Sequence, residues 1–102
     1  MSIEKKYLKT GGVCKVTFSL PSAIAQTAKT VNVVGDFNNW DRSMHLMKKS
    51  KNGKFSLSLN LEKNKEYKFR YLIDDTNWET DWDTDSVVPI PWGDEYNSVV
   101  KL

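Results

Sequence analysis

A strict alternation of residue types in residues 55–61 is the feature that most constrains what this chain can fold into. From Phe55 to Leu61 every odd position is apolar and every even position is polar. Successive side chains of a β-strand point to opposite faces of the sheet, so this pattern gives one face for a core and one for solvent. The segment therefore predicts a half-buried strand.

The segment from Tyr67 to Ile73 repeats the alternation with larger side chains. One side carries Tyr67, Phe69, Tyr71 and Ile73, and the other carries Lys68, Arg70 and Leu72. The five residues between the two segments, 62–66, are polar and predict the connection of an antiparallel hairpin.

Further short strands are expected on both sides of these two. Val16, Phe18 and Leu20 alternate with polar residues up to Pro21, which cannot donate to a ladder. Residues 31–34 and 97–102 are rich in β-branched side chains, and Asn52-Gly53 is a strong turn signal. Helical spacing is confined to residues 22–29. The pattern predicts an all-β sandwich.

Composition limits the class of protein further. The 102 residues suit one domain, and the single cysteine, Cys14, cannot form an intrachain disulfide. No signal peptide and no apolar run of about 18 residues is found, so a cytoplasmic protein with no membrane partner is expected. The net charge is +2, without an Arg-rich cluster, which disfavours a nucleic-acid partner.

The four tryptophans, Trp40, Trp78, Trp82 and Trp92, lie outside the main alternating runs. Trp40 and Trp78 each follow a turn rich in Asp and Asn, where an indole is expected to be partly in water. A loop tryptophan can instead fold back to cap the sandwich, and that alternative stays open for each of the four. Exposed indoles beside amides and charged groups suit a sugar, whose C–H patches stack on the ring while its hydroxyls need hydrogen bonds.

A longer run of residues, Val31 to Asp41, resembles the glycogen-binding domain family, the early-set modules of isoamylases, branching enzymes and the β subunit of AMP-activated protein kinase. The similarity continues through Gly53-Lys54-Phe55, Tyr67 to Asp74, Trp78 and the closing Asn97-Ser98-Val99-Val100. The resemblance implies an immunoglobulin-like sandwich that holds an α-1,4-glucan. Carried over by motif, the carbohydrate-binding residues are Trp40, Lys68, Trp78 and Asn97.

The chain departs from the family pattern after Trp78. The loop before the closing strand is Pro89-Ile90-Pro91-Trp92-Gly93, and Trp92 is expected either to widen the binding platform or to cap the core. Trp82 is also additional, and a structural role is expected for it.

Catalytic chemistry is not indicated. The acidic stretch Asp81-x-Asp83-x-Asp85 begins like a calcium loop but has Ser86 and Trp92 where that motif needs Gly and Glu. His45 and Cys14 are the only residues of their types, too few for a zinc site or a triad. We therefore predict no catalytic residues, no metal and no cofactor.

Two functions remain open. The first is a non-catalytic module that binds α-glucans such as glycogen, starch or maltooligosaccharides. The second is a protein-interaction or scaffold module that docks on a glycogen- or starch-metabolising enzyme or a kinase without binding sugar. In either case residues 13–102 are expected to form the sandwich domain. Residues 1–12 are expected to form an N-terminal extension that is free to be flexible.

Overall fold

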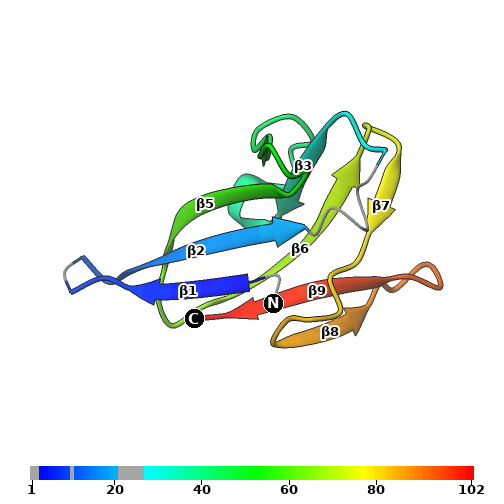
Figure 1. The fold of residues 1–102 in the computed structure, drawn as a ribbon. Coiled ribbons are helices and arrows are strands. Elements are labelled where there is room, and N and C mark those ends of the chain that lie inside the picture. Colours follow the sequence, from blue (N-terminus) through cyan, green and yellow to red (C-terminus); the bar gives the residue numbers. More distant parts are fainter. Residues whose placement is uncertain (1–2, 10, 21–26) are drawn as a thin grey trace.

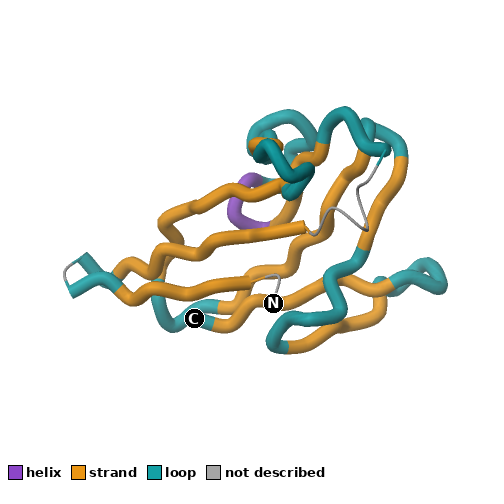
Figure 2. The backbone as a smooth tube through the Cα atoms, in the orientation of Figure 1, coloured by secondary structure: helices purple, strands orange, loops and turns teal. Residues whose placement is uncertain are grey.

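The computed structural model describes residues 3–9, 11–20 and 27–102, and these form two antiparallel β-sheets packed as a sandwich (Figures 1 and 2). The expected all-β, immunoglobulin-like early-set architecture is confirmed. The strands of the described ranges are β1 (Ile3–Tyr7), β2 (Val13–Leu20), β3 (Val31–Gly35), β4 (Lys48–Lys49), β5 (Phe55–Glu62), β6 (Glu66–Ile73), β7 (Asn77–Glu79), β8 (Ser86–Pro89) and β9 (Tyr96–Lys101).

The first sheet has the strand order β1-β2-β5-β4. Thr17 of β2 lies opposite Ser58 of β5, and their hydroxyls hydrogen-bond at 2.8 Å. Directly opposed residues of antiparallel strands share a face, so the polar positions of both strands form one polar outer surface. The alternation in residues 55–61 is confirmed.

The second sheet has the order β3-β6-β9-β8, and the short strand β7 also pairs with β6. The core between the sheets is built on aromatic contacts: the ring centroids of Phe18 and Phe69 are 5.1 Å apart, and those of Phe69 and Tyr71 are 5.7 Å apart. Edge-to-face pairs of this kind add to the free energy gained by burial. The core also contains Ile3, Cys14, Val16, Leu20, Ala28, Val31, Val33, Met47, Phe55, Leu61 and Val100.

The prediction of a hairpin at residues 62–66 is wrong. β5 belongs to the first sheet and β6 to the second, so the short connection crosses from one layer of the sandwich to the other. Both strands present their odd-numbered apolar residues to the same core from opposite sides. Local sequence cannot distinguish a turn within a sheet from one between sheets, because both need only a few polar residues.

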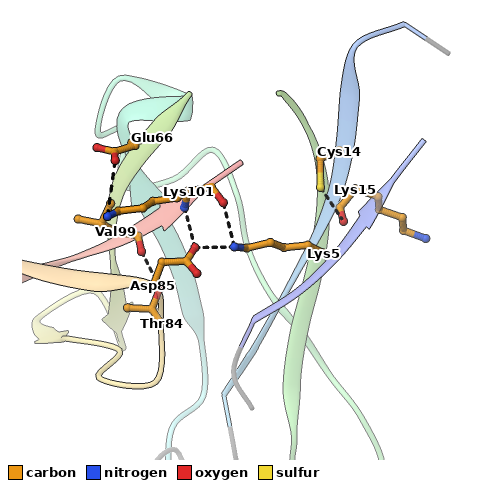
Figure 3. A network of polar contacts seen from close by, with 8 residues as sticks. All are labelled: Lys5, Cys14, Lys15, Glu66, Thr84, Asp85, Val99 and Lys101. Carbon is orange, nitrogen blue, oxygen red and sulfur yellow. Dashed lines mark hydrogen bonds and ion pairs between the residues drawn. The ribbon is translucent and has the colours of Figure 1, made fainter. Parts of the chain in front are cut away.

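Residues 3–7, assigned to the N-terminal extension above, form β1 and pair with β2 along their length. Figure 3 shows the side chain of Lys5 reaching across to the second sheet, where its Nζ is 2.6 Å from Asp85 Oδ2 and 2.8 Å from the backbone oxygen of Lys101. Asp85 Oδ2 also accepts the backbone N–H of Lys101 at 2.7 Å. This clasp ties the edges of the two sheets together.

The clasp changes the pKa of Asp85. Burial acts to raise it, but the hydrogen bonds from the Lys101 backbone and from Lys5, with the charges of both lysines, outweigh burial and lower the pKa below its usual value.

A second polar network lies deeper. The hydroxyl of Tyr71, which is fully buried, donates to Asp81 Oδ2 at 3.0 Å, and the Asp81 backbone N–H donates to Ser98 Oγ at 2.7 Å. Burial, followed by the charge and the hydrogen bond of Asp81, raises the pKa of Tyr71. These bonds hold the chain after β7 against β9.

The segment that follows the Trp40 turn lies against β3. Residues 45–47 run beside β3, since Leu46 forms a bridge with Asn32 and Met47 N–H donates to Val31 O at 2.8 Å. Most of the helical turn considered for residues 22–29 lies outside the described residues. Within the described part, no helix has the length and apolar character needed to cross a membrane.

Candidate functional site

The turn that follows β3 is built around a buried asparagine. Asn38 is 3% exposed, and its Oδ1 accepts the Gly35 N–H at 3.0 Å while its Nδ2 donates to Val33 O at 3.0 Å. The same Nδ2 lies 2.8 Å from His45 Nδ1, which must accept because an amide nitrogen only donates. Asn38, the first asparagine of the Gly-Asp-Phe-Asn-Asn-Trp run, therefore holds the turn in place through its side-chain hydrogen bonds.

Gly35 brings this turn close to β6. A Cβ at this position would lie 2.4 Å from the backbone oxygen of Lys68 and 2.7 Å from Cβ of Phe69. Only glycine leaves room for that approach, which sets the start of the turn directly against the backbone of β6.

Trp40 is held at the end of the turn by Asp36. Its backbone φ is +59°, following Asn39 at +55°, and its N–H donates to Gly35 O at 2.9 Å. Its indole Nε1 donates to Asp36 Oδ1 at 3.0 Å, and Asp36 Oδ2 accepts the Lys68 N–H at 2.8 Å. One carboxylate thus joins the tryptophan to the strand that carries the lysine.

The register of the second sheet puts the other predicted residues on the same face. Trp78 of β7 lies opposite Leu72 of β6, and Lys68 lies opposite Val99 of β9. Opposed residues share a face, as do residues two apart on a strand, so Lys68, Trp78 and Asn97 all point away from the core. The outward direction expected for Lys68 is confirmed.

These side chains line one groove of about 660 Å³ on the outer face of the second sheet. The turn after β3 forms one wall, β6 forms the floor, and β7 with the β8–β9 connection forms the other wall. The groove contains every residue predicted for sugar binding, namely Trp40, Lys68, Trp78, Trp92 and Asn97, together with Asp36, Arg42, Arg70, Ile90, Pro91 and Glu95.

Two guanidinium groups lie over the ring of Trp78. The Cζ of Arg70 is 5.4 Å and that of Arg42 is 5.5 Å from its ring centroid. Arg70 is 7% exposed, and its Nη2 is 3.1 Å from Glu95 Oε1, whereas Arg42 is exposed. The indole therefore makes one cation–π contact with a buried, ion-paired arginine and one with an exposed arginine from the opposite wall.

Trp92 does not cap the core, because it is 82% exposed at the tip of the β8–β9 connection. That connection is closed by the Ile90 N–H, which donates to Glu95 O at 3.0 Å. Trp82 is 64% exposed, with its ring centroid 5.3 Å from that of Tyr96, so its expected structural role does not include burial in the core.

The site predicted from the sequence did not include Asp36, Arg42, Arg70 or Glu95. The alternation in β6 placed Arg70 on the same outward side as Lys68, and this pattern could have identified Arg70 as a site residue. It also implied solvation of that side, yet Leu72 and Arg70 are 1% and 7% exposed, with Trp78 of β7 directly opposite Leu72 and its ring close to the Arg70 guanidinium. No local pattern marked Arg42 or Glu95, since only the folded loops bring them to Trp78.

The two groove carboxylates, Asp36 and Glu95, each accept hydrogen bonds from groove residues. Aromatic faces, an amide, cations and carboxylates in one open groove on a β-sandwich define a carbohydrate-binding module. The chain belongs to the carbohydrate-binding module 48 family, the isoamylase N-terminal domain, whose sequence profile matches residues 8–92. This family is a carbohydrate-binding module and not a catalytic domain. Comparison with curated proteins gave no match.

The matched residues end at Trp92 and so stop before β9. Asn97 therefore joins the candidate site through its position in the groove, while Trp40, Lys68 and Trp78 also fall within the family match.

Proposed function

We propose that this chain is a non-catalytic module that binds α-1,4-glucan chains, such as glycogen, starch or maltooligosaccharides, through Trp40, Lys68, Trp78, Asn97 and Trp92. The observation that carries the proposal is the position of all five residues in one groove, although they come from five separate segments of the chain. We assign the binding unit to residues 13–102, because every groove residue falls there and β1 lies on the other sheet.

The groove supplies both kinds of contact that a glucose unit needs. Indole faces accept the C–H patches of the ring, while Lys68 and Asn97 offer donors and an acceptor for the hydroxyls. The volume is within the range of about 300–1,000 Å³ that is common for ligand sites. Because the groove is open on the outer face, a polymer can pass through it without needing a chain end.

Binding is expected to be weak for a short oligosaccharide. If each of two indoles loses about 100 Å² of apolar surface to a sugar ring, the gain is about 5 kcal/mol before the entropy lost on association. The dissociation constant is then on the order of 0.1–1 mM. Many equivalent sites on one polymer give a tighter apparent affinity.

Titration of maltoheptaose, followed by tryptophan fluorescence and isothermal calorimetry, tests the proposal directly. A saturable response in the millimolar range or below is expected, with cellohexaose as the control for the geometry of the glycosidic bond. No response to maltoheptaose at several millimolar, with the protein folded, would contradict the proposal.

A second candidate is a scaffold module that docks on a glycogen- or starch-metabolising enzyme or a kinase. It is favoured by the aromatic side chains outside the sugar-stacking positions, since Trp82 is 64% exposed and Tyr96 beside it is 38% exposed. This function predicts that the chain associates with a protein and that sugar does not change the association. Light scattering with and without maltoheptaose measures it. A cytoplasmic location accompanies both candidates, and the buried free thiol of Cys14 is compatible with it.

A further inference from the structure

The two arginines that contact Trp78 limit the access of a sugar to its ring. A tryptophan has two faces, and stacking by a sugar needs one of them. Arg70 comes from the floor of the groove, is almost fully buried, and is ion-paired with Glu95. Moving Arg70 away from the indole would separate it from Glu95 and leave a buried charge unpaired, so this contact is fixed.

Arg42 contacts Trp78 from the other side of the groove. It belongs to the wall that follows β3, whereas Trp78 is on β7, and β6 lies between those two strands in the sheet. The side chain thus spans the floor of the groove to bring its Cζ within 5.5 Å of the ring centroid. Arg42 is exposed whereas Arg70 is 7% exposed, so Arg42 is the outer of the two cation contacts of the ring.

The contact of Arg42 is weakly held. Apart from its position over Trp78, the guanidinium has no hydrogen bond or ion pair within the described residues. Arg70 differs in each respect, being buried and doubly bonded to Glu95 at 3.1 and 3.5 Å. The first arginine is placed as a movable cover and the second as a fixed support.

We propose that Arg42 is an affinity-determining strap that occupies the sugar-stacking face of Trp78 and is displaced when a glucan binds. This inference rests on the proposed function and adds a residue that opposes binding to those that favour it. The strap leaves Trp40 free for the first contact, so a sugar engages Trp40 and Lys68 and then competes with the guanidinium for Trp78.

Removal of the strap should tighten binding. A cation–π contact at an exposed site is worth about 0.5–1 kcal/mol, which corresponds to about a two- to fivefold decrease in the dissociation constant. We expect Arg42→Ala to bind maltoheptaose two- to fivefold more tightly than the unmodified chain in calorimetry. The matched control is Lys51→Ala, which removes an exposed cation from the turn between β4 and β5 and should leave the affinity unchanged.

A measurement on Arg42 itself separates the strap from the binding function. In the free protein the ring current of Trp78 should shift the Arg42 Cδ–H signals upfield in ¹³C-correlated NMR spectra, and Trp78→Ala should remove the shift. Saturation with maltoheptaose should also remove it. Stronger binding by Arg42→Ala, or binding by that variant alone, supports the strap.

Three outcomes would overturn it. Weaker binding by Arg42→Ala would make the guanidinium a sugar ligand instead of a cover. An upfield shift that persists at saturation would show that sugar and strap do not compete. If neither the unmodified chain nor Arg42→Ala binds maltoheptaose while the shift is present, the proposed function fails together with this inference.

Discussion

The two outer faces of the sandwich differ although both are built on alternating strands. On the first sheet the outer positions of β2 and β5 carry mainly polar side chains, as in the opposed pairs Thr17–Ser58 and Lys15–Asn60. On the second sheet the outer residues Arg70, Leu72 and Val99 are almost fully buried, and the loops beside β6 form a groove that Arg70 lines. Both faces are therefore built on similar strands, and the adjoining loops decide which face can bind a ligand.

The largest effect should come from removing the aromatic rings of the groove. The double variant Trp40→Ala/Trp78→Ala loses about 5 kcal/mol of stacking, equivalent to more than a thousandfold in affinity, so binding to maltoheptaose becomes undetectable by calorimetry. The matched control is Trp82→Ala, which removes an exposed indole outside the groove and should bind as before. Residual binding by the double variant near the original affinity would place the site elsewhere.

The next effect concerns the turn that carries Trp40. Asn38→Ala leaves the Gly35 N–H and the Val33 carbonyl without partners in a buried site, at a cost of about 2–4 kcal/mol in the free energy of unfolding. Ser58→Ala on the outer face of the first sheet should change it by less than about 0.5 kcal/mol. Urea denaturation of both variants measures the difference, and equal losses would remove the distinction between the two faces.

Alkaline pH should weaken the second sheet through Tyr71. Its pKa is raised above the ordinary value of 10.0, so the folded state keeps the phenol protonated after the unfolded chain has ionised. This stabilisation is complete below about pH 10 and is lost as the pH rises further. Between about pH 9 and about pH 11.5 the unfolding free energy should fall more steeply for the unmodified chain than for Tyr71→Phe. Equal slopes in urea denaturation would contradict this.

At neutral pH the same variant should be about 1–2 kcal/mol less stable, because Asp81 loses one donor in a buried position. Tyr7→Phe is the matched control, since Tyr7 on β1 is 53% exposed and its hydroxyl should contribute little at either pH.

The smallest effect should come from the clasp between the sheets (Figure 3). Asp85→Asn removes a partly exposed ion pair with Lys5, and pairs of this kind contribute about 0.2–1 kcal/mol. Because the pKa of Asp85 is lowered in the fold, its contribution is present above about pH 4 and is lost as the pH falls through the folded value. The difference from the unmodified chain should be measurable at pH 7 and should vanish at acid pH. A difference that remains at low pH would assign the effect to packing.

Much of the fold could be read from the chain because strands have a short, local signature. The alternation in residues 55–61 and 67–73, with the Asn52-Gly53 turn, gave β5, β6 and the β4–β5 connection. The local pattern does not identify the partner of each strand. For this reason the polar residues 62–66 predict a hairpin, although β5 and β6 belong to different sheets. The short strands β1, β7 and β8 were also missed, since three to five residues hold too little pattern to stand out.

The sequence by itself determined the all-β class, the strands β5 and β6 and the turn that precedes Trp40, because period-two burial and turn chemistry act between near neighbours in the chain. Only the tertiary structure decided that Trp40, Trp78 and Trp92 meet in one groove, and that two arginines contact Trp78. Those contacts join residues on different strands and loops, and their distances depend on strand register and on the packing of the two sheets, which no local pattern encodes.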